Sequence, residues 1–196
     1  MATDKGEATR ERILEASLEL FELGGFQNMR INKICARVGL SPTSVYWHFG
    51  SKAGLVQAVL ESAFAPLGIS MLEDIRGASG PRQITVFISH LRKLIHERPM
   101  GACTMLAYLQ DESHRSDDLD IALRKTRGDE LAGQIKLMKT MLKLNSSQAK
   151  KLSITINACV NYAVMIKLSG GSDLEIEDVL ATIRQQITSA DELGKS

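Results

Sequence analysis

The sequence predicts an all-helical protein of about nine helices, on three observations. Apolar residues recur at steps of three and four along nearly the whole chain, which is the period of an amphipathic helix. No segment shows the alternation of a half-buried strand or a hairpin turn signal. Two short amphipathic segments are joined by a glycine-containing turn, which is the pattern of a helix-turn-helix. With 196 residues, 44% hydrophobic and 24% charged, the chain has an ordinary globular composition.

The first helix is expected from Glu7 to Leu23. One face of this segment carries mostly apolar residues at helical spacing. These residues are Ile13, Leu14, Ser17, Leu18 and Phe21. Gly24-Gly25 follows directly and is expected to stop the helix.

The turn between the two short helices lies at residues 39–41. Ile34, Cys35 and Val38 give the helix before it an inward face. Gly39 can take the left-handed conformation that ends a helix at little cost. Ser41 is then the expected N-cap of a third helix over residues 42–49, with a proline at its first position, where the missing N–H costs nothing.

A fourth helix follows, for which Ser51 is a plausible N-cap. Pro66 is expected to kink or end this helix, because proline cannot donate the backbone hydrogen bond. We place the domain boundary there, with a three-helix, homeodomain-like helix-turn-helix domain over residues 1–65 and a second helical domain over residues 66–196. In the second domain, Ser172 and Glu175 form a capping-box pattern. Its helical patterns cover residues 82–97, 100–112, 117–144, 147–168 and 173–190.

The third helix carries the side chains best suited to DNA. Val45 and Phe49 already occupy its inward positions, so Tyr46, Trp47 and His48 are hard to bury on so short a helix. A major groove accepts one helix, whose N-terminal exposed residues can reach base edges. The alternative is that the two short helices belong to an ordinary bundle and that the tyrosine and tryptophan are core residues.

Positive charge accompanies this motif, although the whole chain has a net charge of only +1. Every charged residue between positions 23 and 60 is basic, which is typical of a small electrostatic footprint for DNA. Lys52 would hold a phosphate together with the backbone N–H groups of the helix start. The candidate DNA-binding residues are Arg30, Lys33, Thr43, Ser44, Tyr46, Trp47, His48 and Lys52.

The stretch from Ile34 to Lys52, ICARVGLSPTSVYWHFGSK, resembles the DNA-binding signature of the TetR family, and the preceding Leu20-Phe21 with Gly25-Phe26 matches as well. The resemblance is specific over about residues 10–60 and implies a homodimeric repressor that binds a palindromic DNA operator. It also implies that the second domain binds a small-molecule effector. The sequence departs from the family pattern at several positions, and Ala53-Gly54 stands where an acidic pair is typical.

The last two helices are the expected dimer surface, as the resemblance implies. The helix over residues 147–168 is apolar on almost all sides, so it must be buried all round. An intramolecular core is the alternative for the same residues. The residues assigned to the dimer interface are Leu152, Ile156, Val160, Val164, Ile176, Val179, Leu180, Ile183 and Ile187.

Candidates for an effector pocket are apolar residues rich in methionine, which lines adaptable pockets but also fills plain cores. Their character predicts a largely apolar effector. The candidates are Phe64, Leu67, Met71, Phe87, Leu91, Cys103, Met105, Leu106, Met138, Met141, Tyr162 and Met165.

Other classes of function have weaker support. Three cysteines at wide spacing predict neither a disulfide framework nor a zinc site, and we expect no metal and no cofactor. Cys103 or Cys159 would serve a redox-responsive regulator, which stays open as an alternative. Acidic residues and a histidine over Asp111–Asp118 would suit a helical enzyme, but a solvated loop is the simpler interpretation. No signal peptide or membrane span is evident, so we expect a cytoplasmic protein.

Overall fold

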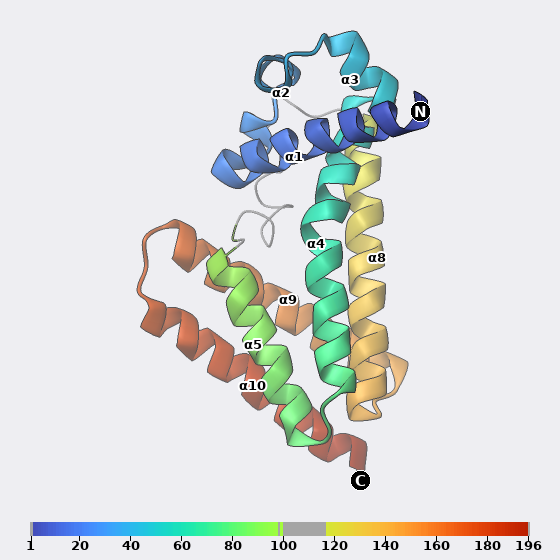
Figure 1. The fold of residues 1–196 in the computed structure, drawn as a ribbon. Coiled ribbons are helices and arrows are strands. Elements are labelled where there is room, and N and C mark those ends of the chain that lie inside the picture. The colour runs from blue at the N-terminus through green and yellow to red at the C-terminus, as the bar shows by residue number, and fades with distance from the viewer. Residues whose placement is uncertain (1, 98, 100–116, 196) are drawn as a thin grey trace. The chain divides into compact units, whose positions relative to one another are not determined.

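The computed structural model describes residues 2–97, 99 and 117–195 (Figure 1), and every regular element within them is a helix, as the sequence predicts. The all-helical fold is therefore confirmed. The pattern over residues 100–112 lies outside the described residues. The helices are α1 (Ala2–Asn28), α2 (Ile31–Val38), α3 (Pro42–Phe49), α4 (Lys52–Arg76), α5 (Pro81–Glu97), α8 (Asp117–Leu142), α9 (Ser146–Leu168) and α10 (Asp173–Lys195).

The chain divides into two compact units. Among the described residues, the first unit holds 2–66 and the start of α8 up to Thr126. The second unit holds the rest of α4, α5, the remainder of α8, α9 and α10. The assignment of separate functions to residues 1–65 and 66–196 remains a prediction.

The first unit begins with α1, which is interrupted at the glycine pair that the sequence predicts as its stop. Gly24 and Gly25 leave helical geometry, with a φ of 63° at Gly25, yet the helix resumes and reaches Asn28. A positive φ is easily adopted by glycine because it has no Cβ. Helical geometry therefore breaks at the predicted glycine pair, and α1 as bounded here includes a short second helical stretch after it.

The predicted turn and caps are present around α3. Gly39 has the left-handed φ of 71° and donates its N–H to the carbonyl of Cys35. The hydroxyl of Ser41 accepts from the N–H of Ser44 at 3.2 Å. The hydroxyl of Ser51 accepts from the N–H of Gly54 at 3.0 Å and so caps the first turn of α4. These local bonds fix where α3 begins and where α4 takes over from it.

α4 continues beyond Pro66 to Arg76, whereas the sequence suggests a kink or an end at this proline. In the part of the chain that the structure describes, α4 alone is long and apolar enough to cross a membrane by length and composition. This is weak evidence, since the core helix of a soluble protein passes the same test. Leu55, Val56, Val59 and Leu60 in the first half of α4 are buried in the core of the first unit.

One apolar core holds the helix-turn-helix together. Its members come from α1, α2, α3, α4, the connection between α1 and α2, and the start of α8. The core residues are Ile13, Ala16, Leu20, Phe21, Met29, Ile34, Cys35, Val38, Val45, Ala53, Leu55, Val56, Val59, Leu60 and Leu123. Val45 is the buried residue that α3 supplies, so α3 depends on its neighbours for its orientation.

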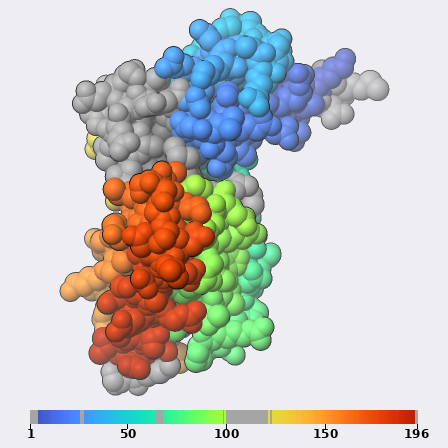
Figure 2. Space-filling view, turned by 90° about the vertical axis from the view of Figure 1, so that its left-hand side faces the viewer, coloured from blue at the N-terminus to red at the C-terminus, as the bar shows by residue number. Residues whose placement is uncertain are grey.

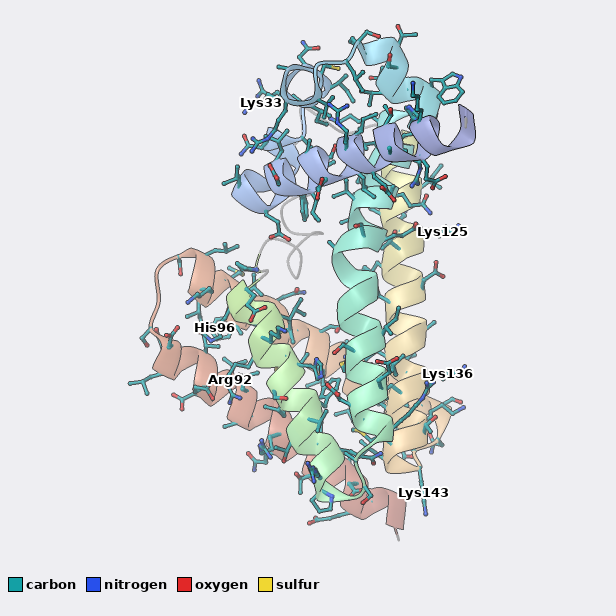
Figure 3. The ribbon with its side chains drawn as sticks, viewed as in Figure 1. Lys33, Arg92, His96, Lys125, Lys136 and Lys143 are labelled. Atoms are coloured by element: carbon teal, nitrogen blue, oxygen red, sulfur yellow. The ribbon has the colours of Figure 1, made fainter. Side chains whose placement is uncertain are left out.

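In the second unit, α5 packs against both α9 and α10, and α10 lies beside α5 on the face shown in Figure 2. Arg92 on α5, labelled in Figure 3, donates two hydrogen bonds of 2.6 Å to Glu177 on α10. This pairing holds the pKa of Glu177 below its ordinary value. The charged pair ties the two helices together beside their apolar contacts.

Both C-terminal helices start with capping boxes. Glu175 accepts from the N–H of Ser172 at 2.8 Å, and the N–H of Glu175 donates to the Ser172 hydroxyl at 3.3 Å, which confirms the predicted pattern. Asn145 and Gln148 form an equivalent pair at the start of α9 that the sequence analysis did not identify. Each pair satisfies two backbone N–H groups that a helix start otherwise leaves unbonded.

Candidate nucleic-acid interface

α3 presents a polar and aromatic face to solvent. Trp47 is 79% exposed and Tyr46 is also exposed, while Val45 between them and the turn is fully buried. An exposed tryptophan on a short helix offers a large amphipathic surface that a binding partner can cover. The alternative that Tyr46 and Trp47 are core residues therefore does not hold for the described structure.

The start of α3 offers small polar groups. Thr43 is exposed, and Ser44 is half-buried with its hydroxyl 3.1 Å from that of Ser41. Since Ser44 already takes part in the N-cap, Thr43 is the freer of the two hydroxyls to meet a base edge. His48 is half-buried, and its ring meets the ring of Trp47 edge-on at 4.8 Å between centroids.

The predicted basic residues flank α3 at different places. Lys33, on α2, is exposed and donates to the side chain of Asn28 at 2.8 Å (Figure 3). Arg30 is the N-cap residue of α2 with an extended backbone, and its side chain makes no capping bond. Lys52 opens α4 and is half-buried. Arg37, a further basic residue of this region, pairs with Glu19 at 2.7 Å.

Two arginines that the sequence analysis did not select hold the motif from α1. Arg12 donates to the carbonyl of Val38, the last residue of α2, at 3.0 Å. Arg10 lies 5.1 Å from the centre of the Phe49 ring at the end of α3, within the range of a cation–π interaction. A sequence signal existed, because both arginines lie on a helix expected to pack on the motif, but their partners are set by tertiary structure.

The residues predicted for a dimer interface lie almost entirely inside the protomer. All of them are buried except Val179, which is half-buried. The open face of α9 is instead on the opposite side of the helix and carries Ile154, Ala158, Asn161, Tyr162, Met165 and Leu168. We call these residues the α9 stripe. Because apolar residues occur on almost all sides of α9, hydrophobicity alone could not tell its inner face from its outer one. The buried set is thus corrected to core, and the α9 stripe becomes the surface to consider for a partner.

The predicted effector-pocket residues separate into three groups. Phe87, Leu91 and Met138 are buried in the second unit, and Met71 and Met141 are half-buried. Tyr162 and Met165 are exposed on the α9 stripe, so they do not line the interior of the second unit. Cys103, Met105, Leu106 and the side chains of Phe64 and Leu67 lie outside the described residues.

The rival sites gain no support from the part of the chain that is described. Asp111–Ser116 and the side chains of Asp117 and Asp118 lie outside it, and within it no group of acidic, histidine or cysteine residues could hold a metal ion. Of the cysteines proposed for redox sensing, Cys159 is half-buried on α9 and Cys103 lies outside the described residues.

Comparison with known proteins agrees with this geometry. Residues 13–59 match the model of the bacterial regulatory proteins of the TetR family. The HTH-type transcriptional regulator SrpR of Pseudomonas putida is 37% identical over 71 residues, which are 36% of this chain and 33% of SrpR. The HTH-type transcriptional repressor SCO4008 of Streptomyces coelicolor is 26% identical over 94% of this chain and 96% of its own length.

The fold agrees as well. The crystal structure of a TetR-family regulator from Cytophaga hutchinsonii superposes with a TM-score of 0.72 at 17% identity, covering 94% of this chain and 96% of that one. The arrangement of α2 and α3 and these matches define a helix-turn-helix protein. Residues 13–59 are thus similar to the DNA-binding part of the TetR family of transcriptional regulators, and the chain as a whole has the fold of a solved TetR-family regulator.

Proposed function

We propose that this regulator reads its operator with the exposed face of α3, placed in a major groove. The observation that carries the proposal is the exposure of Trp47 beside the buried Val45. Thr43 at the start of α3 reaches base edges, and Tyr46, Trp47 and His48 lie at the flanking sugars, phosphates and bases. Arg30, Lys33 and Lys52 add contacts to phosphates, which set the affinity and its dependence on salt.

We further propose that the chain acts as a homodimer through the α9 stripe. Ile154, Tyr162, Met165 and Leu168 are each about half exposed or more, and they share one face of a single helix. Such a largely apolar strip, which Asn161 interrupts, is typical of an interface and is uncommon on a monomer. In a two-fold symmetric dimer, each contact of the α9 stripe occurs twice. The same symmetry suits a palindromic operator with two half-sites.

The second unit is the proposed place for a small-molecule effector. Phe87, Leu91 and Met138 supply an apolar interior, with Met71 and Met141 beside them, so we propose a largely apolar effector. The effector would favour a state of the dimer that binds the operator less well. Binding of effector and operator is then reciprocally coupled, each lowering the affinity for the other by the same factor.

Repression in the cytoplasm is the simplest regulatory outcome. SCO4008, which aligns over most of both chains, is named a transcriptional repressor. A protein that occupies an operator blocks access to it without needing any further activity. A regulator of this kind acts where the DNA is, and in bacteria this is the cytoplasm.

The experiment is selection of DNA by the purified full-length chain from a random-sequence pool at fixed salt. We expect enrichment of a palindrome with half-sites about one helical turn apart. A folded, dimeric protein that enriches no sequence, with and without candidate apolar effectors, would refute the proposal. The selected DNA is then the probe for effector screening, since a true effector must change the operator affinity.

A further inference from the structure

The chain passes from α3 to α4 through a two-residue connection. Gly50, with a φ of 73°, ends α3 and donates its N–H to the carbonyl of Tyr46 at 2.7 Å. Ser51 donates its N–H to the carbonyl of Phe49 at 2.8 Å, and its side chain caps α4. So short a connection leaves the end of α3 directly against the first turn of α4.

Gly54 is the residue of α4 that meets the end of α3. A Cβ placed on Gly54 would overlap the carbonyl oxygen of Phe49, and the carbonyl carbon would be only 3.3 Å away. The obstacle is backbone at the end of a helix, so it cannot rotate aside as a flexible side chain could. The observed approach of α3 to α4 therefore requires glycine at position 54.

The two helices do not resist displacement equally. α4 contributes several fully buried residues to the core of the first unit, including Leu55 and Val56 next to Gly54, whereas α3 contributes Val45. A side chain at position 54 would therefore displace α3 more readily than α4. The residue displaced most would be Phe49, because its carbonyl lies against Gly54. Its ring is in contact with Arg10 of α1.

We propose that Gly54 is a positioning residue for DNA recognition, because the absence of a side chain there sets how α3 sits against α4. It touches no DNA itself and acts through the end of α3. The inference rests on the proposed function, in which α3 enters the major groove. Base contacts need hydrogen-bond geometry, so a small displacement of α3 costs sequence recognition more than it costs general attraction to phosphates.

Three alanine variants of the full-length chain test this. Gly54→Ala introduces the overlap at α3. Gly68→Ala lies in the same helix and meets nothing within 4 Å, so it controls for the general effect of alanine on a helix. Gly194→Ala would overlap the carbonyl oxygen of Leu142 in the second unit, so it controls for a similar strain far along the chain from the DNA-binding motif.

For each variant, the affinity for the selected operator and for random DNA is measured alongside the melting temperature. We expect Gly54→Ala to lose about tenfold or more in the ratio of operator to random-DNA affinity, comparable to the loss of one base contact. Gly68→Ala and Gly194→Ala should keep the wild-type ratio, even if Gly194→Ala melts earlier. A purely structural role for Gly54 would lower the melting temperature and leave this ratio unchanged.

A folded Gly54→Ala variant with the wild-type ratio would overturn the inference. If Gly54→Ala does not fold, Arg10→Met is measured in its place, because it removes the cation–π contact with Phe49 without adding an overlap. A wild-type ratio of operator to random-DNA affinity in Arg10→Met would then overturn the inference that the position of the end of α3 controls recognition. Failure of the wild-type chain to select any sequence refutes the proposed function first, and this inference with it. Selection by the wild type with an unchanged variant ratio refutes only the role of Gly54.

Discussion

Replacing Ile154 by alanine should weaken self-association of the chain, because this residue lies on the α9 stripe. Full burial of an isoleucine contributes about 1.5–3 kcal/mol. Ile154 is already half covered in the protomer, at 50% exposure, so a partner has about half of that free energy left to gain. The side chain occurs twice in a two-fold dimer. Alanine keeps part of the contact, so the dimer should lose about 1–2 kcal/mol, a five- to thirtyfold rise in Kd.

Sedimentation equilibrium over a range of protein concentrations measures this Kd directly. Ile121→Ala is the matched control, since Ile121 on α8 is 65% exposed and lies outside the α9 stripe. It should leave the Kd unchanged. A wild-type Kd for Ile154→Ala, or an equal loss for both variants, would refute the assignment of the α9 stripe to the dimer.

Three further outcomes are expected. Lys52→Ala should weaken binding to all DNA sequences and flatten the slope of log affinity against log salt by about one unit, measured by titration at several salt concentrations; an unchanged slope would remove this lysine from the interface. Ser41→Ala should lower the free energy of unfolding by about 1 kcal/mol in urea titration through loss of the α3 cap, whereas Ser189→Ala, at an exposed position of α10, should be nearly neutral. Because the hydrogen bond from Arg92 lowers the pKa of Glu177, the stability from this pair is present above the ordinary glutamate pKa of 4.5 and lost as the pH falls below it. Arg92→Met should therefore flatten the fall of melting temperature in acid, and an unchanged acid profile would show that the pair does not contribute.

The helix-turn-helix could be predicted in detail because local chemistry determines it. Gly39, Ser41 and Ser51 act within a few residues of their own positions, and each has the role that its residue type suggests. The exposure of Trp47 followed from counting the inward positions of a short helix. Patterns of this kind are visible in sequence because cause and effect lie within one helical turn.

The orientation of α9 could not be predicted in the same way. Its apolar residues surround the helix, so Ile156 and Ile154 look equivalent in sequence although one is buried and the other is exposed. Which face turns inward depends on how α5 and α10 pack against it. A helix without a polar side carries no periodic signal for that choice.

The contacts that hold α3 from outside were also hidden from sequence. In the sequence, Gly54 is only a departure from the family pattern. In the structure, a side chain at this position would overlap the carbonyl oxygen of Phe49. Arg12 reaches the carbonyl of Val38 across 26 positions of the chain. Both contacts depend on the tertiary arrangement of the first unit, which residue types alone do not determine.

Reselection with a Thr43→Val variant is the sharpest test of whether the exposed face of α3 reads the bases of the operator. Valine keeps the size and one methyl group of threonine but removes the hydroxyl, so phosphate contacts stay as they are. We expect the variant to select a palindrome changed at one or two positions in each half-site, with little loss of affinity for random DNA. Selection of the wild-type palindrome at the wild-type affinity would contradict a role for this part of α3 in reading the sequence.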